Sequence, residues 1–339
     1  MWRRIREFFL LTDFKRGAMV VVPAVLIVIT LVLMFLWDFE PETFDVQQRA
    51  ADRAAARGED VVTGYVTTST LMEVGEILLG KRGGYLTNDK LPPGVLMDNI
   101  PNWEYGVVRQ VRDLAESMRN DMSRSQTQSK EDPDLAIAAP RFQFDTDSWI
   151  LPSTESQYRE GIKALSAYLS RLADQDQANA QFYARADNLS DWLALVEKRL
   201  GDLAQQLANS VGDSRVDAGL AGDPAATQST PAPGEISEKT SWFEIDDIFY
   251  EARGATWALI HFLRAAEIDF GPVLENKNAT ASLQNVIRAL EPTQATVWSP
   301  IILNGTGFGF TANHSLVMGS YISRANAAII ELRRLLAQG

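Results

Sequence analysis

One uninterrupted apolar run, GAMVVVPAVLIVITLVLMFLW at residues 17–37, constrains this chain more than any other feature. It contains no charged side chain, and about 20 such residues are needed for a helix to cross the ~30 Å hydrocarbon core of a bilayer. Backbone polar groups cannot stay unpaired in lipid, so a single span has to be helical. The run therefore predicts one transmembrane helix, with the lipid bilayer as its partner.

The charges on either side of this run predict its orientation. Residues 1–16 contain five basic and two acidic side chains, whereas residues 38–45 contain four acidic side chains and no basic one. Basic flanks stay in the cytoplasm, so residues 1–16 should form a short cytoplasmic tail and the longer part should be exported. The run ends MFLWDFE without a small-residue cleavage site, which favours an uncleaved signal anchor.

The residue composition excludes several classes of function. The chain has no cysteine, so disulfides, thiolate metal sites and cysteine nucleophiles are excluded. Its only histidines, His261 and His314, argue against a multi-histidine metal site, and we expect no cofactor. The net charge is −12 although the tail is basic, so the exported part is strongly acidic and should not bind nucleic acid.

Apolar residues recur at steps of three and four through most of the exported part, which is typical of amphipathic helices. These patterns predict helices near residues 46–57, 67–79, 102–122, 154–172, 182–207, 242–266, 279–290 and 315–337. A short break separates the predicted helices at 154–172 and 182–207. These two helices should form an antiparallel hairpin. No sustained two-residue alternation predicts a strand. The expected fold class is all-α, with one N-terminal transmembrane helix followed by an elongated bundle of amphipathic hairpins.

Composition divides the exported part into four segments. They are an acidic stalk at 38–64, a first helical half at 65–211, a disordered linker at 212–240, and a second helical half at 241–339 that packs on the first. Two apolar loops rich in Gly or Pro, at 83–101 and 298–313, should be packed rather than floating. The helical seams could close within one chain or between chains, so a homo-oligomer stays open.

Three acidic residues are candidates for acid–base chemistry. Glu73 lies one helical turn from Glu76, and Asp98 and Glu104 flank Pro101. A glycosidase needs two such carboxylates, one protonated and one ionised, and peptidoglycan is the polymer of the envelope. A domain this rich in acids produces such pairs by chance, however, so solvated carboxylates are the favoured interpretation and no catalytic residue is assigned.

The polar run SRSQTQS at 123–129 follows the predicted helix 102–122 directly. It lacks the Gly and Pro of the linker, which argues against a loose tether. Its hydroxyl, amide and guanidinium groups either satisfy an ordered loop, the favoured interpretation, or contact a ligand or partner. The candidate binding residues are Ser123, Arg124, Ser125, Gln126, Gln128 and, on the preceding helix, Trp103. The serines lack a suitably placed general base, so serine catalysis is disfavoured.

Four strings, GGYLTNDKLPPG, MDNIPNWEYG, SRSQTQSKED and PSTESQYREG, give the chain a family resemblance. Together they resemble a bacterial family known as domain of unknown function 2333, and the resemblance covers nearly the whole chain. It implies a short inner tail, one membrane span and a helical exported domain in Gram-negative bacteria. It implies no activity and assigns no catalytic residue.

These observations favour a non-enzymatic interaction or scaffold module for envelope components, anchored in the bacterial inner membrane and exposed to the periplasm. An envelope protein is the expected partner. One alternative is an envelope hydrolase that acts on peptidoglycan through paired carboxylates. Another is a periplasmic ligand-binding module built on the two apolar loops.

Overall fold

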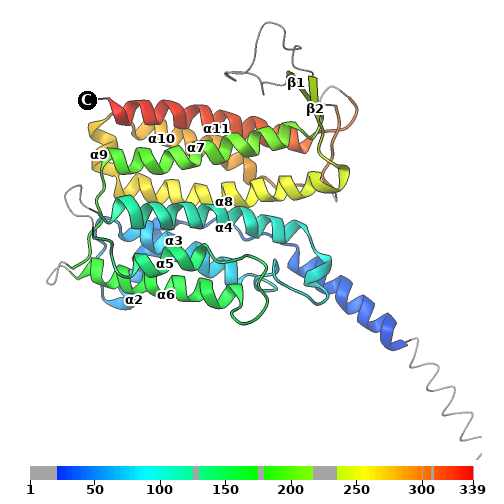
Figure 1. The fold of residues 1–339 in the computed structure, drawn as a ribbon, viewed down its shortest axis with the longest axis horizontal. Helices are drawn as coiled ribbons and strands as arrows, with labels where there is room; N and C mark the ends of the chain where they lie inside the picture. Colours follow the sequence, from blue (N-terminus) through cyan, green and yellow to red (C-terminus); the bar gives the residue numbers. More distant parts are fainter. Residues whose placement is uncertain are drawn as a thin grey trace, which may run out of the picture.

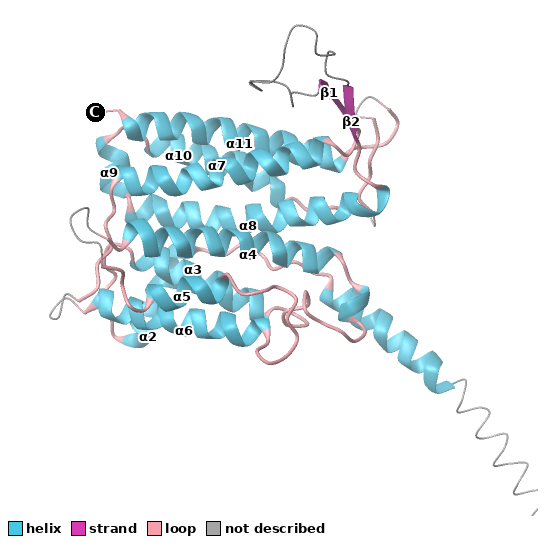
Figure 2. Cartoon of the chain, viewed as in Figure 1, coloured by secondary structure: helices cyan, strands magenta, loops and turns pink. Residues whose placement is uncertain are grey.

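The computed structural model describes residues 21–124, 130–174, 179–216, 235–299, 301–306 and 309–338. Its α-helices are α2 (Val46–Arg57), α3 (Tyr65–Gly80), α4 (Asn99–Ser117), α5 (Leu135–Phe142), α6 (Thr154–Ala173), α7 (Ala186–Ala208), α8 (Ile245–Asp269), α9 (Gly271–Asn276), α10 (Thr280–Leu290) and α11 (His314–Ala337). Short turns are the 3-10 helices η1 (Gly94–Leu96), η3 (Trp242–Glu244) and η4 (Glu291–Gln294) and the π-helical η2 (Met118–Met122). The bundle is helical, as predicted (Figures 1 and 2).

Helices α4 and α8 lie side by side along the middle of an elongated bundle (Figure 1). Helices α7, α10 and α11 pack on one side of this pair, and α2, α3, α5 and α6 pack on the other. Buried side chains from both sides form one continuous apolar cluster. The helices before and after residues 212–240 therefore share a single core.

Two glycines bring α4 and α8 into backbone contact. A Cβ atom at Gly254 would lie 1.9 Å from the carbonyl oxygen of Trp103, and one at Gly106 would lie 2.0 Å from the carbonyl oxygen of Glu251. Trp103 is fully buried beside this crossing, with its ring centroid 5.2 Å from that of Trp257. The residue predicted as a binding candidate is therefore part of the core.

The predicted antiparallel hairpin of α6 and α7 is wrong. Helix α6 packs on α3 and α5, whereas α7 packs on α11 at the opposite side of the bundle (Figure 1). An apolar stripe shows that a helix must bury one face, but it does not specify the partner. Here α5, which sequence patterning missed because it is only 8 residues long, covers part of α6.

Two short strands interrupt the otherwise helical chain. β1 (Asp213–Val216) and β2 (Glu235–Glu238) pair antiparallel, with Asp213 opposite Glu238. They occupy both ends of the segment expected to be a disordered linker, and residues 217–234 between them lie outside the described residues. Four-residue strands are too short to produce a recognisable two-residue alternation.

The predicted membrane span is described only in part. Residues 1–20 lie outside the described residues, and residues 21–37 form a helix with mostly exposed side chains that projects from one end of the bundle (Figure 1). In the part of the chain that the structure describes, no helix combines the length and the apolar character that crossing a membrane requires.

The segment expected to be a stalk is docked against the bundle. Phe44 stacks on His261 with 4.0 Å between ring centroids, and its backbone N–H donates to His261 Nε2 at 3.0 Å. The Nδ1 atom of His261 donates to the carbonyl oxygen of Trp257 at 2.7 Å, which fixes the neutral tautomer. Burial lowers the pKa of His261 from about 6.5 to about 4.

This buried histidine makes stability depend on pH. Between about pH 6.5 and pH 4 the unfolded chain binds a proton at position 261 that the folded chain does not, so stability falls as the pH falls. Relative to His261→Gln, the wild type should lose up to about 3 kcal/mol across this window. Urea unfolding of the full chain in detergent at several pH values measures the difference. A difference between the two proteins that stays constant with pH would contradict the prediction.

Candidate functional site

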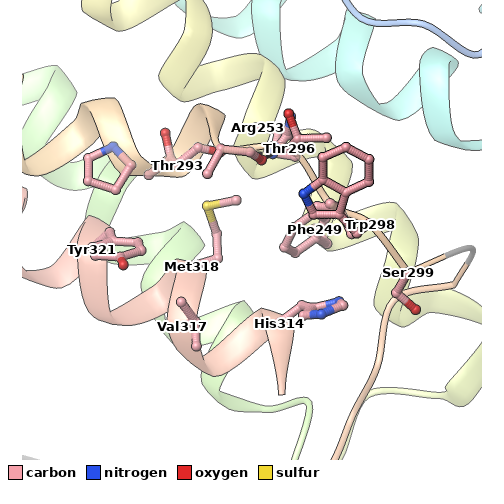
Figure 3. A pocket seen from close by; sticks show the side chains of 13 residues that line it. Phe249, Arg253, Thr293, Thr296, Trp298, Ser299, His314, Val317, Met318 and Tyr321 are labelled. Carbon is pink, nitrogen blue, oxygen red and sulfur yellow. Dashed lines mark hydrogen bonds between the residues drawn. The ribbon is translucent and has the colours of Figure 1, made fainter. Parts of the chain in front are cut away.

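A cavity of about 380 Å³ lies between α8, α11 and the segment that follows η4. Its walls are mainly apolar: Phe249 on α8, Met318 and Tyr321 on α11, and Trp298 on the loop (Figure 3). Met318 points into the space, and the Trp298 ring lies at its edge, beside Phe249. Small-molecule sites typically have volumes of about 300–1,000 Å³ and apolar walls with few polar groups. We take this cavity as the candidate functional site.

Arg253 forms the polar wall of the cavity, yet most of its N–H groups are already bound within the chain. Its Nη1 atom donates to the carbonyl oxygens of Thr293 and Ala295 at 3.1 and 2.8 Å. Its Nε and Nη2 atoms donate to the carboxylate of Glu40, and the pair is 2.5 Å apart. The guanidinium therefore neutralises Glu40 and ties residues 38–43 to η4, instead of attracting an anionic ligand.

His314 lies at the opposite wall, at the start of α11 (Figure 3). Its Nδ1 atom accepts the backbone N–H of Leu303 at 3.2 Å, so in the neutral ring Nε2 carries the proton. Burial lowers the pKa of His314, which favours this neutral form. The ring can thus donate a hydrogen bond from Nε2, but it is not poised to take a proton from Ser299, the serine that lines the same cavity.

The lining is suited to an apolar group. The only titratable side chains that line the cavity are Arg253, His314 and Tyr321, and no carboxylate is among the described lining residues. General acid–base catalysis of glycoside cleavage needs a pair of carboxyl groups. An uncharged chain or ring with one hydrogen-bond acceptor would complement the apolar walls and the His314 donor.

The carboxylates singled out from sequence are each held by a different structural partner. Arg53 bridges Glu73 and Glu76 with Nη2 distances of 2.8 and 2.7 Å. Asp98 caps the start of α4, where it accepts the backbone N–H of Asn99 at 2.9 Å. The structure does not bring these residues together around a common space.

Glu104 is the deepest of these carboxylates. It is fully buried and pairs with Lys81 at 2.5 Å. It also accepts the backbone N–H groups of Leu86 and Thr87 at 2.9 and 2.8 Å and the Thr87 hydroxyl at 2.5 Å. Burial raises the pKa of Glu104, and the Lys81 ammonium opposes that shift. The residue predicted as a catalytic candidate thus pins the loop 81–98 onto α4.

The polar run 123–129 is described only at its start. Ser125, Gln126 and Gln128 lie outside the described residues. The hydroxyl of Ser123 donates to the carbonyl oxygen of Arg119 at 3.2 Å, and Arg124 is half-buried. Ser123 therefore completes the end of the preceding helix.

Sequence reasoning identified the loop 298–313 as part of a possible ligand site, which includes Trp298 and Ser299 of the cavity, but missed the lining residues on α8, such as Phe249 and Arg253. Arg253 was the available signal, because it is a charged residue flanked by Ala252 and Gly254 in an otherwise apolar seam. A charge in such a position has to be paired. Its partner, Glu40, lies more than two hundred residues away in sequence, so no local pattern could identify it.

The fold and the cavity describe an all-α protein with an apolar pocket near the end from which helix 21–37 projects. The chain belongs to a bacterial family described as "Uncharacterized protein conserved in bacteria" (DUF2333), which matches residues 12–339. This confirms the resemblance drawn from the four sequence strings. No curated protein and no solved structure matches the chain.

Proposed function

We propose that this protein is an interaction module of the bacterial envelope, anchored in the inner membrane by residues 17–37 with its helical bundle in the periplasm. Its cavity between α8 and α11 receives an apolar segment of an envelope protein. The observation that carries the proposal is the cavity itself, which is mainly apolar and whose charged group, Arg253, is paired with Glu40 within the chain.

The membrane anchor rests on the sequence of residues 17–37 and on the charges that flank it. The contact of Glu40 with Arg253 adds a structural reason for the anchor and the cavity to act together. Because residues 38–43 run directly from the end of helix 21–37 to the cavity wall, the cavity lies close to where the chain would leave the membrane.

Photocrosslinking in living bacteria tests the binding role. A photoreactive amino acid would replace Val317, which lines the cavity and is 52% exposed. The control would replace Ile330, which is 43% exposed on the same helix but does not line the cavity. We expect a protein-sized product from position 317 and none from position 330, because only the first probe reaches a group seated in the cavity.

Three other outcomes of the crosslinking would contradict the proposed protein partner. A small, lipid-sized mass increase at position 317 would show that the cavity binds a lipid and not a segment of a protein. Equal products at both positions would show non-specific contact, and no product at either position would remove the cavity from the proposal.

A further inference from the structure

Exposed apolar side chains gather at one end of the bundle. Apart from helix 21–37, the six most exposed large apolar side chains of the described residues are Leu91, Ile150, Leu151, Phe243, Trp298 and Phe310, each at least 62% exposed. They belong to the α3–η1, α5–α6 and η4–α11 connections and to η3, and these segments lie at the end from which helix 21–37 projects (Figure 1). At the opposite end, the most exposed large apolar side chain in a described loop is Val61, at 51%.

Contacts hold two of these connections around the end of helix 21–37. The ring of Trp37 lies against Gly83, and the Arg82 guanidinium lies 5.8 Å from the centroid of the Phe39 ring. The loop 81–98 in turn holds the loop 143–153, because the Tyr85 hydroxyl donates to the carbonyl oxygen of Thr146 at 3.0 Å. The loops that carry Leu91, Ile150 and Leu151 are thereby joined to each other and to the base of the projecting helix.

Further contacts place the segments that carry Trp298 and Phe243 at the same end. Residues 38–43 line a common hollow of about 660 Å³ with Thr296, Val297 and Ser299, so the segment that carries Trp298 lies near the start of the exported chain. The Asn102 side chain donates to Asp247 Oδ1 at 2.6 Å, which joins the start of α4 to the start of α8 next to Phe243.

The exposed apolar side chains of this surface are better suited to contact with the interfacial region of a bilayer than to contact with water. Large aromatic and aliphatic side chains that surround an apolar helix are typical of membrane–water interfaces. Leaving them in water forgoes about 25 cal/mol for each Å² of apolar area. Acidic residues at the same end, such as Asp38 and Asp98, argue against attraction to anionic headgroups. Contact would therefore come from apolar insertion.

We propose that this end of the bundle rests on the membrane, with the loop tips at Leu91, Ile150, Leu151, Phe243, Trp298 and Phe310 inserted among the lipid headgroups. The proposal rests on the anchoring role given to residues 17–37 above. It adds that the bundle is seated directly on the lipid surface instead of being held away from it by a flexible stalk.

The absence of cysteine allows a direct test on the full chain. Single-cysteine variants Leu151→Cys and Phe310→Cys would carry an environment-sensitive fluorophore in phosphatidylcholine nanodiscs, with and without lipids that bear a doxyl quencher just below the headgroup. Leu31→Cys reports on the span, and Val61→Cys, at the far end of the bundle, is the matched control. We expect emission at Leu31, Leu151 and Phe310 to fall about twofold or more, because Leu31 would lie within the bilayer and the two loop positions within its headgroup region. Emission at Val61 should not change.

The variants separate the two proposals. Quenching at Leu31 without quenching at Leu151 and Phe310 would overturn the surface contact and leave the anchor intact. High emission at both loop positions without quenching would show that they lie in an apolar environment that is not lipid. A second copy of the chain would then cover this surface, and the lipid contact would be overturned. No quenching at Leu31 would overturn the anchor and, with it, the seating on the membrane. Equal quenching at Val61 would overturn the orientation. All four positions are exposed, so the substitutions should leave the core intact, which circular dichroism can check.

Discussion

Gly254→Ala should destabilise the bundle by about 3 kcal/mol or more, toward the upper end of what overpacking a core costs. The added methyl group would lie 1.9 Å from the carbonyl oxygen of Trp103. A backbone atom cannot move aside as a side chain does, so α4 and α8 would have to separate along the middle of the bundle. Chemical unfolding of the full chain in detergent, followed by tryptophan fluorescence, measures the loss.

Gly201→Ala is the matched control for this substitution. Gly201 also lies inside a helix, α7, but a Cβ atom there would find its nearest neighbour, Asn326 Nδ2, at an ordinary distance of 3.6 Å. Alanine is favoured over glycine in a helix interior by about 0.5–1 kcal/mol. Gly201→Ala should therefore stabilise the protein slightly. If both substitutions stabilise it, the α4–α8 crossing is not as close as described.

Lys81→Met should cost about 3–5 kcal/mol, the usual effect of removing one partner from a buried ion pair. Glu104 would remain fully buried without its ammonium, although it would keep the N–H groups of Leu86 and Thr87. The loop 81–98 should loosen first, because Lys81 and Glu104 hold it to α4. Equilibrium unfolding gives the free energy, and hydrogen exchange locates the loosened segment.

The same variant should recover stability as the pH falls. Burial raises the pKa of Glu104, so the folded state binds a proton in a range where the unfolded state has released it, and stability falls as the pH rises through that range. Arg264→Met is the control, because the Arg264–Glu291 pair, 2.8 Å apart, is largely exposed. Exposed pairs contribute about 0–1 kcal/mol. Equal losses for Lys81→Met and Arg264→Met would show that burial does not strengthen the Lys81–Glu104 pair.

A buried carboxylate can serve either catalysis or the stability of the fold, and Glu104 shows that sequence spacing does not distinguish the two roles. Glu104 follows a proline break and lies close to Asp98 in sequence, which is compatible with an acid pair. In the structure it faces Lys81 and the backbone of residues 86–87 instead. Sequence spacing gives no information on such long-range partners, because they are set by how the loop folds back over α4.

The amino-acid sequence by itself determined the helical class, the family, and nearly every long helix, because a stripe of apolar residues at steps of three and four can be buried only as a helix. It also indicated the apolar run at 17–37 that supports the proposed anchor. Only the tertiary structure decided which helices pack together, that α4 and α8 meet at Gly106 and Gly254, and that Arg253 reaches Glu40 beside the cavity. The physical reason is that periodicity reports which face a helix buries, whereas partner choice depends on close packing and charge pairing between residues far apart in the chain.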